Sequence, residues 1–185
     1  MDLETILRET AVTTVFVTHD RDEAFMIGDR VAVVIDGRLL QVGATAEVFA
    51  HPVNEKVAQF VGVDTKIAAI VETVAQGVAQ VGFNGGSAEV AADLQPGERV
   101  LLCLRPEDIT LSPAAGEVLS ARNRLVGKVV KIFPWGSCYR VGVECGASRL
   151  VALIARPSFA DLGLREGDGV VASFKADAVH VIRRK

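Results

Sequence analysis

A histidine stands where a predicted strand gives way to a predicted helix. The segment from Thr13 to Phe25 reads "TTVFVTHDRDEAF", in which a β-branched and aromatic run stops just before His19. Open α/β sheets bind ligands at the carboxyl ends of their strands, so this position favours a chemical role for the imidazole. On position alone, capping of the next helix or a hydrogen bond within a turn is an equal alternative.

The first sixty residues alternate between strand and helix. "TTVFV" predicts a buried strand, and the helix after it has Asp20 as its N-cap with Glu23 completing a capping box. A hairpin follows, with Asp36 and Gly37 in a two-residue turn. Two short helices, "AEVFAH" and "NEKVAQFVG", then lead to Gly62.

The stretch "VFVTHDRDEAFMIGDRVAVVIDGRLLQVGATAEVFAHP" resembles the end of the nucleotide-binding domain of ATP-binding cassette import ATPases. The resemblance implies that His19 is the switch histidine, which contacts the γ-phosphate and helps to position the attacking water. An imidazole suits this role because it can donate a hydrogen bond to a phosphate oxygen. Asp20, Glu23 and Asp29 also match, and they are interpreted as capping and hairpin-supporting residues.

Other parts of such an ATPase are missing from the sequence. It has no Gly-x-x-x-x-Gly-Lys-Ser/Thr loop, no strand ending in Asp-Glu and no Ser-Gly-Gly signature. We therefore expect no ATP hydrolysis by this chain alone, and ATP with Mg²⁺ only in a full-length protein. The chain is then a carboxyl-terminal fragment of a longer ATPase or comes from a truncated or mis-started gene. "DLETILRET" directly after Met1 favours truncation.

Beyond Gly62 the sequence changes to short alternating strands with glycine-rich turns, which is typical of all-β modules. We predict an α/β remnant of an ATPase domain over residues 1–63. Two small OB-like barrels follow, over residues 64–113 and 118–185.

The two β modules repeat one pattern. "LQPGERVLLCLRPEDITL", from Leu94, and "LREGDGVVASFKADAVHV", from Leu164, share their order of residue types at a constant offset. Arg105 therefore falls opposite Lys175. Duplication is favoured over a chance agreement of glycine and acid turns. Arg105 and Glu107 are predicted to form a structural ion pair.

Three segments of the last module resemble one known domain. "SARNRLVGKVVKI", "LIARPSFADLGLREGD" and "ASFKADAVHVI" are similar to the molybdate- and tungstate-binding barrel called the Mop or molybdenum TOBE domain. In that family a Ser-Ala-Arg-Asn segment, a Thr-x-x-Ser loop and a Lys-Ala turn converge on a tetrahedral oxyanion, usually between two copies. The oxyanion-binding residues that the resemblance implies are Ser120, Arg122, Asn123, Ser158, Lys175 and the backbone of Ala176.

The chemistry of these groups fits a dianionic ligand. Hydroxyl, guanidinium, carboxamide, ammonium and backbone amide groups all donate hydrogen bonds, and two of them are cationic. The oxyanion carries its metal already wrapped in oxygen, so no protein metal site is predicted. Ala155 stands where the family commonly has threonine, which removes one hydroxyl donor. The alternative is that Arg122 and Lys175 are ordinary solvated charges.

Composition excludes several classes of function. The net charge of -3 and the lack of a basic block argue against nucleic-acid binding. The 3 cysteines include no Cys-x-x-Cys pair, which argues against a disulfide framework or a zinc site. The sequence contains neither a membrane-spanning apolar run nor a signal-peptide pattern, so we expect a cytoplasmic protein that reaches a membrane only through a partner.

The leading hypothesis is the carboxyl-terminal regulatory portion of the ATP-binding subunit of a tungstate or molybdate importer. In the family, oxyanion in the last barrel can hold the transporter in a non-transporting state. The implied partners are a second copy of the chain and a membrane permease, which would place the chain at the inner face of the membrane. One alternative is a free-standing oxyanion-binding or storage protein. Another is a dimerisation module of an importer ATPase for iron, sugar or polyamine. Tungstate and molybdate share shape and charge, so the sequence does not separate them.

Overall fold

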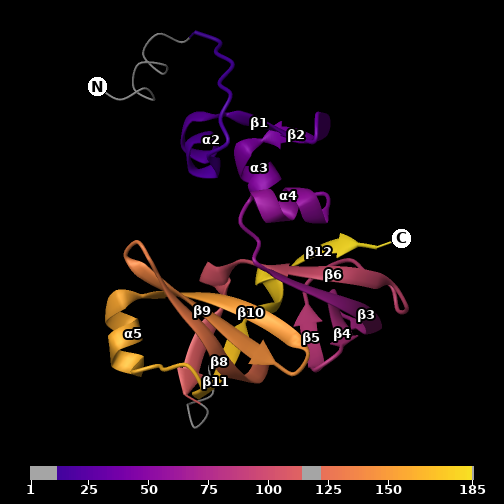
Figure 1. The fold of residues 1–185 in the computed structure, drawn as a ribbon. Helices are drawn as coiled ribbons and strands as arrows, with labels where there is room; N and C mark the ends of the chain where they lie inside the picture. The colour runs from indigo at the N-terminus through magenta and orange to yellow at the C-terminus, as the bar shows by residue number, and fades with distance from the viewer. Residues whose placement is uncertain (1–11, 114–121, 185) are drawn as a thin grey trace. The chain divides into compact units, whose positions relative to one another are not determined.

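The computed structural model describes residues 12–113 and 122–184. The chain divides into two compact units, Met1–Gly62 and Val63–Lys185. Figure 1 shows that helices and one hairpin make up the first unit, whereas strands dominate the second. In the described part of the chain, no helix combines the length and the apolar character needed to cross a membrane.

The first unit contains short helices and a two-stranded hairpin. Its elements are α2 Arg21–Ile27, β1 Arg30–Ile35, β2 Arg38–Ala44, α3 Thr45–Ala50 and α4 Glu55–Phe60. The predicted hairpin turn is confirmed, with φ of 52° at Asp36 and 71° at Gly37. Two positive φ angles in succession are the geometry of a tight turn that matches the twist of the strands.

The N-terminal cap of α2 is also confirmed. The Asp20 side chain accepts hydrogen bonds from the backbone N–H groups of Asp22 and Glu23, at 2.7 and 3.2 Å. The predicted capping box does not close, because the Glu23 carboxylate instead accepts a hydrogen bond from the Thr18 hydroxyl. The cap therefore rests on Asp20, and Glu23 ties the helix to the residue before His19.

The buried strand predicted before His19 is not formed. Residues 12–17 are exposed, with Val15 and Val17 at 90% and 89% exposure, and no described strand pairs with them. An isolated extended segment has no neighbour against which to bury side chains or to pair its backbone groups. The sheet expected of an ATPase remnant is therefore not seen among the described residues of this unit.

The described part of the second unit consists of strands with three short helical segments. The strands of its first half are β3 Thr65–Ala75, β4 Val78–Phe83, β5 Gly86–Val90, β6 Arg99–Leu104 and β7 Thr110–Pro113. Those of its second half are β8 Asn123–Trp135, β9 Cys138–Cys145, β10 Ser148–Ala155, β11 Gly169–Phe174 and β12 His180–Arg183. The helical segments are α5 Arg156–Leu162 and two 3₁₀ turns, η1 Pro106–Asp108 and η2 Ala176–Ala178.

The predicted internal repeat is present, and its two copies exchange their last strands. Counterparts in the aligned segment lie 70 positions apart, since β6 and β11 begin at Arg99 and Gly169. All strand pairs are antiparallel, in two five-stranded sheets of order β12-β6-β3-β4-β5 and β10-β9-β8-β11-β7. Thus β12 of the second copy completes the sheet of the first, and β7 of the first completes the sheet of the second. Each sheet is therefore completed by a strand of the other copy, and the predicted pair of separate barrels is not confirmed.

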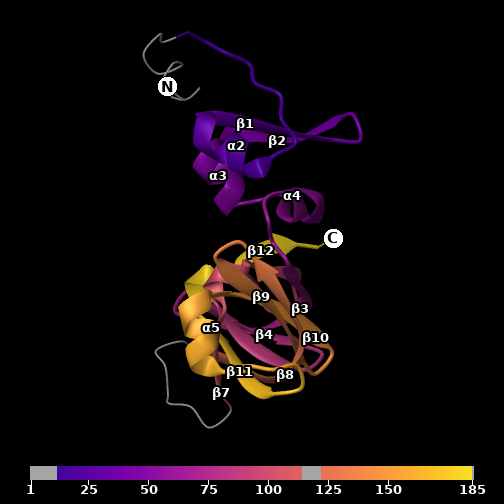
Figure 2. The same cartoon turned by 60° about the vertical axis from the view of Figure 1, so that its left-hand side comes forward.

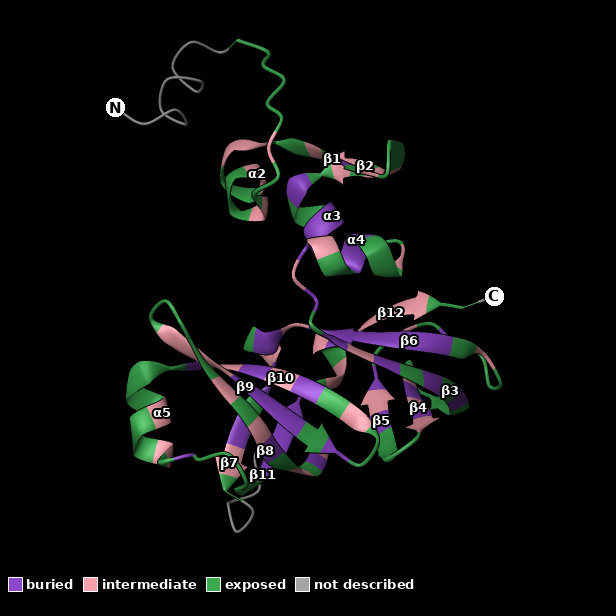
Figure 3. Cartoon of the chain, viewed as in Figure 1, coloured by how far each residue is buried: buried purple, intermediate pink, exposed green. Residues whose placement is uncertain are grey.

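Both sheets contribute to one hydrophobic core. Its largest fully buried side chains include Phe174, Leu102, Leu104 and Leu150, which come from both repeats. Figure 2 shows the second unit after a turn of the view, and Figure 3 shows that its buried residues concentrate in the strands while α5 has none. Sharing of a core by both repeats follows directly from the exchange, because each sheet lacks one strand without the other copy.

Gly127 in β8 permits a close approach between strands. A Cβ atom there would lie 2.5 Å from both the Cys145 Sγ and the Glu144 carbonyl oxygen, and 2.7 Å from a Val143 methyl group. We expect Gly127→Ala to lower the free energy of unfolding by about 2–3 kcal/mol, because the surrounding backbone must shift. Urea titration followed by tryptophan fluorescence measures this loss. Trp135 is the single tryptophan of the chain and lies in the second unit, so the signal reports the unfolding of that unit.

Gly169→Ala is the matched control. Gly169 lies on the neighbouring strand β11 opposite Lys128, and nothing lies within 4 Å of its added Cβ atom. We expect a change within about 0.5 kcal/mol for this variant. Equal losses in the two variants would contradict the proposed close approach at Gly127.

Candidate oxyanion-binding site

The outer edge of β5 holds two of the segments that carry predicted site residues. Asn123, at the start of β8, is buried, and its side chain bonds twice to the main chain of Glu89. Its Oδ1 accepts from the Glu89 N–H at 2.7 Å, and its Nδ2 donates to the Glu89 carbonyl at 2.8 Å. Two residues further on, the Ala91 N–H donates to the Ala176 carbonyl at 3.0 Å. One strand edge therefore fixes the starts of both β8 and η2.

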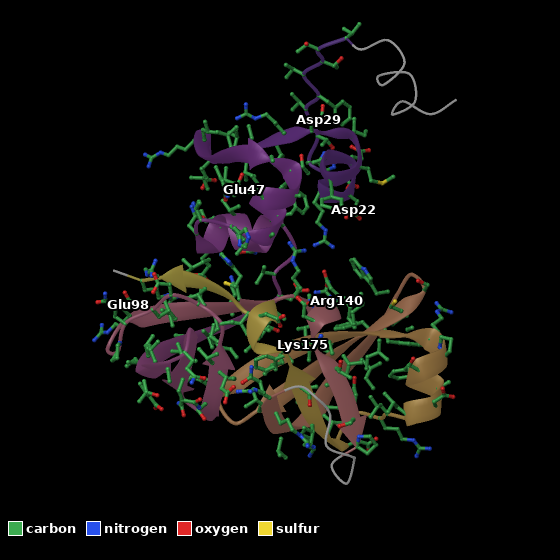
Figure 4. The ribbon with its side chains drawn as sticks, turned by 180° about the vertical axis from the view of Figure 1, so that it is seen from behind. Asp22, Asp29, Glu47, Glu98, Arg140 and Lys175 are labelled. Atoms are coloured by element: carbon green, nitrogen blue, oxygen red, sulfur yellow. The ribbon has the colours of Figure 1, made fainter. Side chains whose placement is uncertain are left out.

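Arg122 and Lys175 lie beside these two anchors. In the antiparallel pair of β8 and β11, Asn123 is opposite Phe174. Arg122 precedes Asn123 and Lys175 follows Phe174, so the two cations come just beyond the same end of this strand pair. Both side chains are exposed, and Lys175, labelled in Figure 4, has no ion-pair partner among the described residues. Two cations at the adjacent ends of β8 and β11 provide the positive charge that an anionic ligand needs.

Arg122 is already in contact with a carboxylate. Its Nη1 lies 3.1 Å from the Glu89 Oε2, with side-chain exposures of 72% for Arg122 and 33% for Glu89. An ion pair this exposed contributes little to stability. Sequence reasoning missed Glu89, which precedes Arg122 by 33 positions and belongs to the other repeat.

Ser158 is not brought to this group within one chain. It is exposed in α5, which follows β10 and packs against β9 and β10. Two strands, β9 and β8, separate β10 from β11 in the sheet. Ala155 is the N-cap of α5 and offers no side-chain hydrogen bond. Ser120 lies outside the described residues.

The first repeat has a counterpart to the Asn123 anchor. Thr65 begins β3, and its Oγ1 accepts a hydrogen bond from the Val151 N–H of β10 at 3.0 Å. Thr65 thus takes the place of Asn123, and Val151 takes the place of Glu89. The same device, a polar side chain at a strand start bonded to the edge of the opposite sheet, recurs in both repeats.

The charges around this counterpart differ, because an acid takes the place of Arg122 and the cations are paired with carboxylates. Asp64, which precedes Thr65 as Arg122 precedes Asn123, is paired with Arg140. Arg105 and Glu107 form the predicted ion pair, at 3.6 Å. Burial, the Glu107 carboxylate and Asp177 raise the pKa of Asp108, which Arg105 opposes. This end of the first repeat does not favour an anionic ligand.

His19 lies in a bend directly before the N-cap of α2 and is exposed. The hydrogen bonds that order this bend come from its neighbours Thr18 and Asp20. The imidazole itself is therefore available at the surface of the first unit.

Comparison with known families identifies the last module. Residues 119–181 match the TOBE domain family. That range includes the chain positions of all six residues predicted to bind an oxyanion. This match assigns residues 119–181 to the TOBE domain family. The described part of this TOBE domain runs from Arg122 through β11 and η2 into β12, the strand exchanged with the first repeat.

Relatives that align with nearly the whole chain include ATP-binding proteins of importers. The molybdate/tungstate import ATP-binding protein WtpC of Pyrococcus horikoshii is 38% identical over 175 residues, covering 94% of this chain and 48% of the relative. WtpC of Pyrococcus abyssi is 38% identical over 174 residues, with the same coverage. The spermidine/putrescine import ATP-binding protein PotA of Mesorhizobium japonicum is 28% identical over 187 residues, 99% of this chain and 50% of the relative. The predicted relationship to the ATP-binding subunits of molybdate and tungstate importers is confirmed, and the chain spans about half the length of these relatives.

The fold has a solved counterpart. The cytoplasmic molybdate-binding protein ModG, in a crystal form with molybdate bound, superposes with a TM-score of 0.58 and 22% identity. The match covers 64% of this chain and 95% of ModG. At this level of identity the match shows the fold alone.

The Asn123 anchor generates a stability prediction. We expect Asn123→Ala to lower the free energy of unfolding by about 2–3 kcal/mol, because the partly buried N–H and carbonyl of Glu89 both lose their partner. Thr65→Val removes the single bond to Val151 and should cost about 1 kcal/mol. Urea titration followed by Trp135 fluorescence compares the two. Equal costs, or no cost for Asn123→Ala, would contradict the assigned role of the anchor.

Proposed function

We propose that the TOBE domain of this chain binds tungstate or molybdate. The observation that carries the proposal is that Arg122 and Lys175 lie at the adjacent ends of β8 and β11. The residues that follow them, Asn123 and Ala176, are both hydrogen-bonded at the edge of β5. The names of the WtpC relatives and the molybdate bound to ModG support this choice of ligand. The chain would serve as the carboxyl-terminal regulatory portion of an importer's ATP-binding subunit.

Each predicted residue has a distinct task in this proposal. Arg122 and Lys175 donate charge-assisted hydrogen bonds to the oxyanion, and the Ala176 N–H and the Ser120 hydroxyl add neutral ones. Asn123 positions Arg122, because its carboxamide is bound to Glu89 and buried. Ser158 reaches the ligand from a second copy of the chain, since α5 follows β10, which β9 and β8 separate from β11 in the sheet.

A ligand shared by two copies can regulate a transporter. Binding shifts an equilibrium only when the ligand prefers one arrangement of the subunits over another. A site that takes donors from two copies meets this condition, because the anion binds fully only when the copies are correctly paired. In the longer protein, His19 would act as the switch histidine with ATP and Mg²⁺. A permease would hold the protein at the cytoplasmic face of the membrane.

The PotA relatives favour a second candidate. Their names describe spermidine and putrescine import, so the β modules here would serve only in pairing and regulation of a polyamine importer's ATPase. A free-standing oxyanion storage protein is the third possibility. The polyamine candidate predicts no affinity for oxyanions, whereas the storage candidate predicts binding without any ATPase partner.

Calorimetric titration of the full chain with tungstate, molybdate and sulfate tests the proposal. We expect heats of binding for tungstate and molybdate and weaker binding of sulfate. Absence of heat with all three anions, at protein concentrations that allow pairing of two copies, would refute oxyanion binding and favour the polyamine candidate.

Substitutions locate the ligand. We expect Arg122→Ala and Lys175→Ala each to weaken tungstate binding by about 1.5–3 kcal/mol, the range for hydrogen bonds to charged groups. Arg105→Ala is the matched control, because Arg105 takes the place of Lys175 in the first repeat and is paired with Glu107. The control should bind like the unmodified chain, and unchanged affinity in all three variants would place the site elsewhere.

A further inference from the structure

We propose that the Glu89 carboxylate is an internal competitor that sets the affinity of the oxyanion site. In the empty site it occupies Arg122, and an incoming anion must displace it. The inference rests on the proposed function, and it assigns a regulatory side chain to the first repeat, outside the TOBE domain.

The geometry places the carboxylate where it can be displaced. Its Oε2 lies 3.1 Å from the Arg122 Nη1, within hydrogen-bonding range but longer than the strongest charge-assisted bonds. Arg122 is 72% exposed, so water already competes for the pair and its release costs little. The main chain of Glu89 is held by Asn123, so displacement requires only rotation of the side chain.

The internal repeat indicates that the acid is not needed for the fold. Val151 takes the position of Glu89 in the second repeat, and its N–H makes the equivalent bond to Thr65. The bond to the strand edge uses main-chain atoms in both repeats, so an apolar side chain suffices there. At the Asn123 anchor the edge residue is the acid Glu89, and the residue before the anchor is the cation Arg122. At the Thr65 anchor the edge residue is Val151, and the residue before the anchor is the acid Asp64.

The electrostatic consequence is a lower affinity and a higher threshold. A dianion that binds Arg122 must replace the carboxylate or lie beside it, and like charges at this range disfavour one another. The site would then fill at a higher oxyanion concentration than it would if no carboxylate competed for Arg122. Such an offset suits a sensor, which must remain empty at low ligand concentration.

The test compares Glu89→Gln with the unmodified chain in calorimetric titrations with tungstate at one fixed ionic strength of about 0.1 M, where charges more than about 10 Å apart are largely screened. Glutamine keeps the shape of the side chain and removes the charge. We expect the Kd for tungstate to fall by about 3- to 10-fold. Urea unfolding should show an unchanged midpoint, since the bonds to Asn123 use the main chain.

Glu98→Gln is the matched control. Glu98 pairs with Arg183 at 3.6 Å in the same unit, and Figure 4 shows it at one side, away from Lys175 in the middle. The control makes the same change in net charge but away from Lys175, and salt screens exposed charges that lie far apart. Its Kd for tungstate should therefore stay within about 2-fold of the value for the unmodified chain.

The outcomes separate the inference from the proposed function. Tighter binding by Glu89→Gln, with the control unchanged, supports the inference. Tungstate binding by the unmodified chain with equal or weaker binding by Glu89→Gln overturns the inference and leaves the proposed function standing. An equal gain in the control overturns it as well, because net charge would then be the cause. No binding by either the unmodified chain or Glu89→Gln overturns both.

Discussion

The exchange of last strands between the two repeats is the constraint on which the rest of the second unit depends. Because β12 pairs with β6 and β7 pairs with β11, each sheet is complete only in the presence of the other repeat. Each exchanged strand is preceded by a 3₁₀ turn, so η2 contacts β5 and η1 contacts β10. Lys175 directly precedes η2 and therefore lies at the first repeat. The candidate site thus forms between the repeats.

The structure separates the groups that hold this site from those that would bind a ligand. Asn123 is buried and uncharged, and its two hydrogen bonds to the edge of β5 are shielded from water. Arg122 and Lys175 are exposed and make no contribution of comparable weight to the fold. Their contacts can therefore change when an anion arrives, while the strand ends that carry them stay fixed. Glu89 belongs to both groups, through its main chain and its carboxylate.

Much of this architecture is predictable from sequence, because local patterns determine it. The constant offset between the repeats, the turn at Asp36 and Gly37 and the cap at Asp20 depend on residues close together in the chain. The strand exchange is not predictable in this way, since β12 would show the same apolar pattern beside either repeat. The contact of Glu89 with Arg122 results from that exchange and leaves no local signal. The strand before His19 was predicted wrongly for a related reason, since its apolar run requires neighbouring strands that the described residues do not supply.

Crystals of the full chain soaked with tungstate, measured at a tungsten absorption edge, test the central claim most directly. The account predicts an anomalous peak within hydrogen-bonding distance of both the Arg122 guanidinium and the Lys175 ammonium group, with a second copy contributing Ser158. A peak at the Arg105 end of the first repeat, or a well-ordered Arg122 and Lys175 with no tungsten between them, would contradict it.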